Sequence, residues 1–165
     1  MNMCKVLILL FILSIFCFTY SPAGEKYIDG DVITVRVNDK SLNLVVAKSK
    51  KVKAKGLSDR KQIPHDGMIF FFEKAYIAAF WMKDMYFSID IIWIADNKVV
   101  DIAENVAPQP GVPEYALKTY SPSQNANIVI EISAGSAKQL NIKQGSVIKL
   151  ESGHTNRTKA LGKRK

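Results

Sequence analysis

The sequence predicts a mainly β (α+β) domain, a compact, partly closed β-barrel or roll with one or two short helices. Residues 24–165 contain 27 valines and isoleucines but only seven leucines, and β-branched side chains favour a pleated sheet over a helix. Short apolar runs separated by turn-forming residues are typical of hairpins. The full length of 165 residues suits a single domain.

The N-terminus predicts a secretory signal peptide at residues 1–23. Val6–Phe18 is apolar except for Ser14, and such a run is shorter than the roughly 20 residues of a membrane-spanning helix. Ser21 and Ala23 are small residues that suit cleavage after Ala23. The alternative is an uncleaved anchor through residues 6–20. Either way, the protein is expected outside the cytoplasm, periplasmic or secreted.

Both cysteines, Cys4 and Cys17, lie in this first segment. A mature chain that begins after it therefore has no disulfide, no thiol nucleophile and no thiolate metal ligand. The domain must be held together by its apolar core.

The net charge of +8 is unevenly distributed along the chain. Residues 24–152 carry 17 basic and 15 acidic residues, whereas residues 153–165 carry five basic residues and no acidic one. We predict one domain over 24–152 and a basic, disordered tail over 153–165. Seven of the basic residues fall in Lys48–Lys61, without the interleaved aromatic residues that stack on nucleobases. No nucleic acid is expected; the alternatives are contact with an anionic envelope surface and simple solvation.

The element pattern predicts seven strands and two short helices. The strands are expected at Val32–Val37, Leu42–Ala47, Met68–Phe72, Ile89–Ile94, Lys98–Glu104, Asn127–Ile132 and Ser146–Glu151. Ser49–Lys55 predicts a helix with Ser49 as N-cap and Gly56 at its end, and Ser133–Leu140 predicts a second one. Ala107–Ser123 holds four prolines, and a loop of this length usually has a function or covers something.

Five motifs follow one another along this pattern. They are G-L-S-D-R at 56–60, G-M-I-F-F-F at 67–72, F-W-M-K at 80–83, I-D-I-I-W-I at 89–94 and I-E-I-S-A-G at 130–135. In this order they resemble domain of unknown function 192 (DUF192), a family of small exported domains of bacterial and archaeal type with no established activity. The resemblance implies structural roles for the motif residues Gly56, Arg60, Gly67, Met68, Glu131, Gly135 and Gly145. Ser58, Asp84-Met85 and Ser88 depart from the family pattern, which puts any role of those positions in doubt.

Asp90 is a candidate catalytic residue, because it alternates with Ile92 and Ile94 on one face of an apolar strand. A carboxylate buried there needs a partner. It is either an acid/base or ligand-binding group, or a structural carboxylate that accepts backbone hydrogen bonds, and the second interpretation is favoured.

Trp81, Met82 and Lys83 are ligand-binding candidates together with Asp90. An indole offers a large apolar area with one polar edge, so Trp81 and Lys83 could line a groove. The alternative is that this apolar stretch simply fills the core.

His65 and Lys83 are the remaining catalytic candidates, as assistants to Asp90. The two histidines, His65 and His154, show no metal-ligand spacing, and no acidic run resembles a calcium loop. No metal and no cofactor are expected.

Glu131 alternates with Val129 and Ser133, which predicts an outward-facing carboxylate on a half-buried strand. Arg60 is its predicted ion-pair partner.

Three function classes remain open. The favoured one is a non-catalytic, monomeric binding module outside the cytoplasm, which holds a small ligand, glycan or peptide between the Trp81–Asp90 region and the Ala107–Ser123 loop. The second is a hydrolase-type enzyme that uses Asp90, and the third is an envelope structural or assembly factor without a pocket. No nucleotide-binding or α/β-hydrolase motif is present.

Overall fold

The computed structural model describes residues 27–151. The signal peptide predicted at residues 1–23 and the tail predicted at residues 153–165 lie outside the described residues. The strands are β1 (Val32–Val37), β2 (Lys40–Ala47), β3 (Gly67–Tyr76), β4 (Phe80–Trp81), β5 (Ile89–Ala95), β6 (Lys98–Val106), β7 (Thr119–Tyr120), β8 (Ala126–Ser133) and β9 (Ile148–Leu150). The helices are α2 (Lys50–Lys55), α3 (Ser136–Gln139) and the 3-10 helix η1 (Glu114–Ala116).

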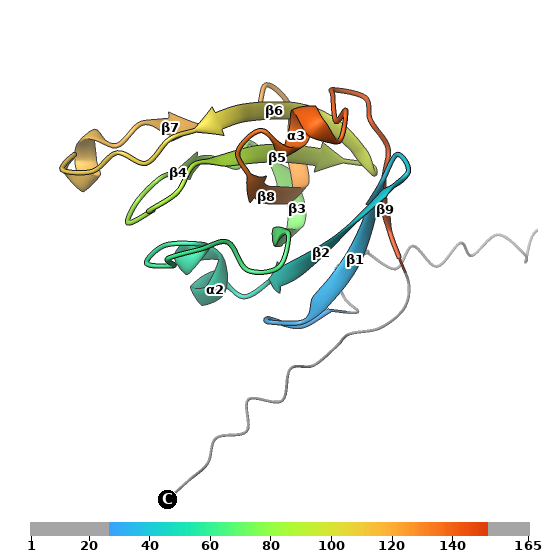
Figure 1. Cartoon of the computed structure of the whole chain (residues 1–165), viewed down its shortest axis with the longest axis horizontal. Helices are drawn as coiled ribbons and strands as arrows, with labels where there is room; N and C mark the ends of the chain where they lie inside the picture. Colours follow the sequence, from blue (N-terminus) through green and yellow to red (C-terminus); the bar gives the residue numbers. More distant parts are fainter. Residues whose placement is uncertain (1–26, 152–165) are drawn as a thin grey trace, which may run out of the picture.

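Seven of the strands form one curled sheet in the order β6-β5-β8-β3-β2-β1-β9, and β4 and β7 form a separate two-stranded ribbon (Figure 1). Within the sheet all neighbours are antiparallel except β2 and β3. A parallel pair requires a crossover connection, and the segment that contains α2 provides it.

The sheet curls far enough for its two outer strands to meet at one end. Lys98 at the start of β6 forms an antiparallel bridge with Val147, and the N–H of Ile148 donates to the carbonyl of Asn97 at 2.8 Å. The predicted mainly β, partly closed barrel with two short helices is therefore confirmed. None of the helices within residues 27–151 is long and apolar enough to cross a membrane.

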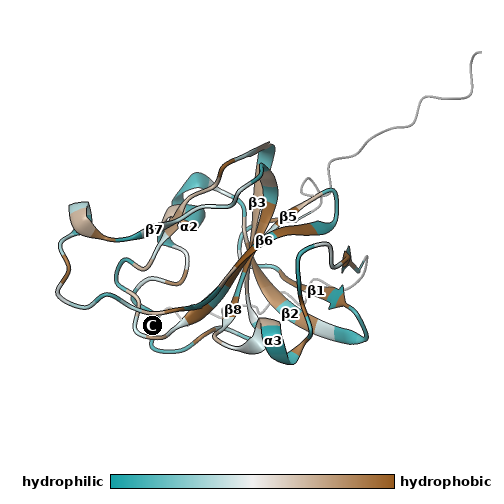
Figure 2. Ribbon diagram, turned by 90° about the horizontal axis from the view of Figure 1, so that it is seen from above, coloured by the Kyte–Doolittle hydropathy of each residue, from teal (hydrophilic) through white to brown (hydrophobic). Residues whose placement is uncertain are grey.

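The alternation of side chains along the strands produces two apolar cores. The first lies inside the curl and draws on most strands of the sheet, including Ile92, Ile94 and Ile130. The second covers the other face of β3, β5 and β8 and contains Trp93 and Phe70. In Figure 2, the strands that cross near the centre of the domain carry many hydrophobic residues, whereas α2 at the periphery is largely hydrophilic.

Most predicted elements are present, and two differ for clear reasons. Ser49 caps α2 by accepting the N–H of Val52, as predicted. The second helix is shorter than Ser133–Leu140, because Ser133 still belongs to β8 and Gly135 has a left-handed φ of 82°.

The predicted Ala107–Ser123 loop contains two elements of its own, η1 and β7. Strand β7 pairs with β4 through Phe80–Tyr120 and Trp81–Thr119. Two-residue strands carry too little periodicity to be recognised in a sequence. The pair forms an arm that projects from the body of the domain, with η1 near its tip (Figure 1).

Candidate functional site

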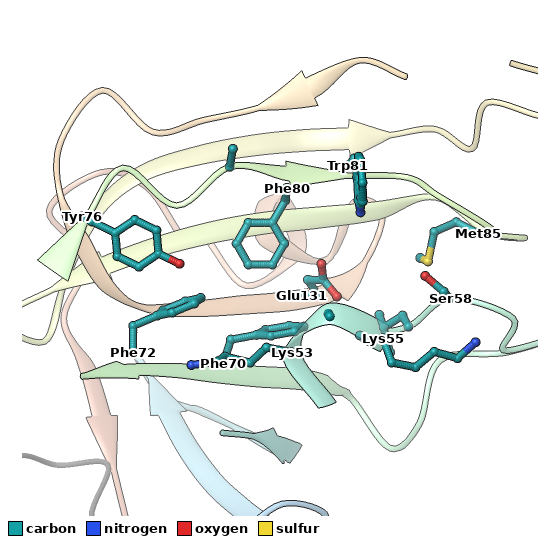
Figure 3. Close-up of a pocket in the computed structure, with 14 residues that line it drawn as sticks. Lys53, Lys55, Ser58, Phe70, Phe72, Tyr76, Phe80, Trp81, Met85 and Glu131 are labelled. Atoms are coloured by element: carbon teal, nitrogen blue, oxygen red, sulfur yellow. The ribbon is translucent and has the colours of Figure 1, made fainter. Parts of the chain in front are cut away.

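A cavity of about 270 Å³ lies on the face of the sheet that α2 covers. Its walls come from α2, from the loop that follows α2, from β3, from β4 and from β8 (Figure 3). The lining residues are Lys53, Ala54, Lys55, Gly56, Leu57, Ser58, Phe70, Phe72, Tyr76, Ala79, Phe80, Trp81, Met85 and Glu131.

Local structure explains why these segments surround a space. The pairing of β3 with β8 is regular up to Phe71 and shifts before Tyr76, so the last part of β3 leaves the regular ladder. The chain then returns over the sheet, where the buried indole N–H of Trp93 donates to the carbonyl of Ala78 at 2.9 Å. On the opposite side, the hydroxyl of Ser58 donates to the carbonyl of Lys83 at 2.8 Å. These two bonds hold the β4 region and the loop after α2 in place around the cavity.

Five of the fourteen lining residues are aromatic. Phe70 and Phe80 meet edge to face with ring centroids 5.3 Å apart, and Phe72 and Tyr76 do the same at 5.1 Å. Such pairs are favourable by about 0.5–1.5 kcal/mol beyond the area that they bury. Trp81 is 43% exposed and completes the rim of the cavity. The aromatic part of the wall is therefore fixed by its own contacts, and polar side chains of α2 and of the loop after it complete the lining.

The carboxylate of Glu131 lies among these aromatic side chains (Figure 3). Glu131 sits on β8, a central strand, between Met68 of β3 and Ile91 of β5, and it is only 5% exposed. Its Oε2 is buried without a hydrogen-bond partner among the described residues. Burial disfavours the charged form and raises the pKa of Glu131 to about 8.

The two lysines that line the cavity are already engaged elsewhere. The ammonium of Lys53 donates to the carbonyl of Phe71 at 3.0 Å and lies 4.5 Å from the centre of the Phe72 ring. Lys55 at the end of α2 forms an ion pair with Asp59, four residues further along the chain. Neither contact directs a cation to Glu131.

The predictions for Glu131 and Arg60 were wrong. Glu131 is buried rather than outward-facing, and Arg60 is exposed and is absent from the ion pairs of the described residues. The alternation along β8 correctly predicts that Glu131 shares one face of the strand with Val129. However, the apolar character of that face comes from Met68 and Ile91 on the neighbouring strands. Register between distant strands is not visible in the alternation of one strand.

Asp90 lies on the opposite face of the same sheet and is completely buried. Its Oδ1 accepts the backbone N–H groups of Asn105 at 2.8 Å and Gly135 at 3.1 Å, and its Oδ2 accepts that of Ala137 at 2.8 Å. These are the backbone hydrogen bonds expected of a structural carboxylate. They tie β6 and the start of α3 to β5, and Asp90 does not line either of the cavities described here.

The other sequence candidates do not gather into one site. Trp81 lines the aromatic cavity. His65 is exposed in the turn before β3, with a positive φ of 49°. No hydrogen bond or ion pair within residues 27–151 joins His65 or Lys83 to Asp90.

Met82 and Lys83 line a second cavity of about 370 Å³. It lies between the loop after β4 and the proline-rich segment, where the sequence predicted a ligand cleft, and Met85 lines both cavities. The ammonium of Lys83 contacts the carboxylate of Glu114 at 2.6 Å across this space. Two of the three charged groups that line the second cavity, Lys83 and Glu114, are thus paired with each other, and Asp84 is the third.

The glycines and the methionine of the motifs have structural positions. Gly56 ends α2 and lines the cavity. A Cβ on Gly67 would overlap the carbonyl oxygen of Glu131, so the close approach of β3 and β8 requires glycine there. Gly135 donates to Asp90, Gly145 donates to the carbonyl of Val99 at 2.8 Å, and Met68 is buried.

Within residues 27–151, no three His, Cys, Asp or Glu side chains lie close enough together to hold a metal ion.

The protein is thus a small β domain with a curled sheet, and the buried carboxylate of Glu131 lies beneath a partly aromatic pocket. The chain belongs to the DUF192 family, described as "Uncharacterized ACR", whose model matches residues 33–150. The family suggested by the five motifs is therefore confirmed.

Two solved structures show the same fold. One is a proposed transcription regulator from Sinorhizobium meliloti 1021, with a TM-score of 0.66 and 24% identity, over 75% of this chain and 97% of that one. The other is a protein of unknown function from Novosphingobium aromaticivorans DSM 12444, with a TM-score of 0.60 and 29% identity, over 72% of this chain and 83% of that one. None of the curated proteins searched matches this chain.

Proposed function

We propose that the domain is a binding module that takes up one small, largely apolar molecule in the aromatic cavity. The observation that carries this proposal is the Oε2 atom of Glu131, which is buried without a partner at the cavity. A buried polar group without a hydrogen bond costs about 1–3 kcal/mol. A ligand that offers a hydrogen bond to this atom would recover that free energy on binding.

The size and the lining of the cavity support a small ligand rather than a glycan chain or a peptide. A volume of about 270 Å³ is close to the lower end of the roughly 300–1,000 Å³ typical of ligand pockets. It corresponds to roughly nine water-sized groups at about 30 Å³ each. Aromatic walls with a small number of polar groups are the usual composition of such a site, and here the polar groups are Lys53, Lys55, Ser58, Tyr76 and Glu131.

The same residues give less support to a hydrolase. A glycosidase-type mechanism needs a second carboxylate close by, and an acyl-transfer mechanism needs an activated nucleophile. Glu131 is the one acidic residue that lines the cavity, and the Ser58 hydroxyl donates to a backbone carbonyl. Asp90 faces the other side of the sheet.

We also propose that the module works outside the cytoplasm, on the strength of the apolar run Val6–Phe18. Expression of the full chain in a bacterial host, followed by fractionation and intact-mass measurement, tests this. A product that begins at Gly24 in the periplasm or the medium supports export with cleavage. A full-length product in the cytosolic fraction contradicts it.

Methyl NMR of labelled methionines tests binding in the cavity. Met85 lines the cavity, so a screen of small aromatic fragments is expected to shift its methyl resonance. Ala79→Phe fills the cavity and should abolish the shift. Ala75→Phe is the matched control, because Ala75 is also exposed but does not line the cavity. Equal shifts in both variants would place the binding elsewhere.

A further inference from the structure

Among the described residues that line the cavity, Glu131 is the one whose side chain has a buried polar atom without a hydrogen-bond partner, and the groups around it do not supply one. On its own face of the sheet the neighbouring residues are Met68 and Ile91, which are apolar. The titratable groups that line the cavity from the other elements are Lys53 and Lys55 of α2 and Tyr76 of β3. Both lysines are held by other contacts, and no hydrogen bond within residues 27–151 joins Tyr76 to Glu131, which leaves the partner of the carboxyl group for a ligand to supply.

The aromatic walls favour a cation as that partner. The face of an aromatic ring carries negative potential and attracts an ammonium group that lies within about 6 Å of the ring centre. The domain already uses the rings of this cavity in that way, since Lys53 lies 4.5 Å from the centre of Phe72 and Lys83 lies 5.9 Å from the centre of Trp81. Lys53 lines this cavity, whereas Lys83 lines the second cavity, where it is paired with Glu114.

Three kinds of ligand can be compared at this position. A neutral ligand with a hydroxyl group could share a hydrogen bond with Glu131 but would leave the electrostatic attraction of the rings unused. An anionic ligand would be attracted by Lys53 and Lys55, but both are already engaged with Phe71 and Asp59. It would also be repelled by the ring faces and would require the carboxyl group to remain protonated. A protonated amine satisfies the carboxylate, and its charge is stabilised by the rings as well.

We infer that the ligand is a small molecule with an apolar body and a basic nitrogen, and that its ammonium group pairs with the ionised carboxylate of Glu131 between the aromatic rings. This inference rests on the proposed function, because it assigns the chemistry of the ligand in the same cavity.

Pairing of the ligand's ammonium group with Glu131 changes the protonation of the carboxyl group. Glu131 is mostly protonated at pH 7 in the free domain, because burial raises its pKa to about 8. Binding of an ammonium group would drive the proton from the carboxyl group to the solvent, since an adjacent positive charge favours the ionised form. Binding at pH 7 should therefore release close to one proton. The affinity should rise about tenfold between pH 6 and pH 7 and level off above pH 8.

Isothermal titration calorimetry of the purified protein with three matched probes tests the inference. The probes are 2-phenylethylamine, 2-phenylethanol and phenylacetate, and titrations in two buffers of different ionisation enthalpy measure the proton release. We expect the amine to bind at least tenfold more tightly than the alcohol and the acid, with release of close to one proton at pH 7. Glu131→Gln should remove both the preference and the proton release.

The outcomes separate this inference from the proposed function. If the alcohol binds as tightly as the amine and no proton is released, the assignment of an amine ligand is overturned. The proposed binding module still stands in that case, provided that Ala79→Phe abolishes binding and Ala75→Phe does not. If none of the three probes binds and aromatic fragments leave Met85 unshifted, both are overturned. The wild-type comparison decides between these outcomes even if Glu131→Gln fails to fold.

Discussion

At the scale of single residues, two buried carboxylates of one sheet have opposite surroundings. Asp90 accepts three backbone N–H groups, whereas the Oε2 of Glu131 accepts no hydrogen bond from the described residues. They lie on neighbouring strands, and the alternation of side chains directs them to different faces. A carboxylate with three donors stabilises a fold, whereas an unpartnered one is a cost that a ligand can offset.

Asp90→Asn is expected to destabilise the domain without affecting binding in the cavity. The amide has one oxygen in place of two, so at least one backbone N–H group of the region around α3 is left unpaired in the interior. We expect a loss of about 2–4 kcal/mol in the free energy of unfolding. Urea denaturation measures the loss, with Asp101→Asn as the control on a less buried aspartate that also accepts backbone N–H groups. Equal stability of Asp90→Asn and wild type would contradict a structural role.

Glu131 should make the domain less stable as the pH rises. Its pKa is raised from 4.5 to about 8 in the folded state, so the folded protein binds the proton more tightly than the unfolded chain does. The resulting stabilisation is complete below about pH 4.5 and is lost as the pH rises through about 8, with a slope of at most about 1.4 kcal/mol per pH unit. Thermal unfolding at pH 6.0 and pH 8.5 should show this loss.

Glu131→Gln serves as the comparison, because the amide does not titrate. Its unfolding temperature should change less between the two pH values than that of the wild type. An identical change in both proteins would mean that Glu131 is not the group responsible.

At the scale of elements, the contact between β3 and β8 determines where Glu131 lies. Gly67 pairs with Ile132, and its missing side chain lets the carbonyl oxygen of Glu131 approach closely. Gly67→Ala should therefore push β8 away and disturb the cavity as well as the fold.

We expect Gly67→Ala to cost more than 2 kcal/mol in the free energy of unfolding, because it adds an overlap to an unfavourable backbone conformation. The matched control is Gly111→Ala, where φ is also positive but a Cβ would meet open space; it should cost about 1 kcal/mol. Denaturation of the two variants side by side measures the difference. Equal costs would show that the overlap is relieved without strain.

The strands with regular alternation of apolar and polar residues could be predicted from the sequence. The prediction failed for elements and side chains whose position depends on neighbours from distant parts of the chain. The hairpin of β1 and β2 follows from apolar runs around a turn. The arm of β4 and β7 does not, because two short strands far apart in sequence pair through only two residue positions.

The same limit applies to the site. The chemistry of its indole made Trp81 a candidate for a groove, with packing in the core as the alternative, and it lines the aromatic cavity. The burial of Glu131 depends on Met68 and Ile91 opposite it, and on aromatic residues contributed by β3 and β4. Only the register of three strands brings these side chains together.

At the scale of the whole molecule, the domain separates stability from binding by using the two faces of one sheet. The core inside the curl holds the strands together, and a hydrogen bond from the N–H of Ala137 to Asp90 ties α3 to β5 beside it. The opposite face carries the second core, which is interrupted by a cavity with one acid. The Oε2 of this acid has no partner among residues 27–151, and in our proposal a ligand supplies one.

The pKa of the Glu131 carboxyl group in the ligand-free protein reports whether this carboxyl group lacks a partner. A carbon-13 NMR titration of the ligand-free protein, with Glu131→Gln to assign the resonance, measures it. We predict a value of about 8, together with a fall when a cationic ligand is bound. A value near the ordinary 4.5 of glutamate in the free protein would contradict the account, because it would mean that the carboxylate is solvated or already paired.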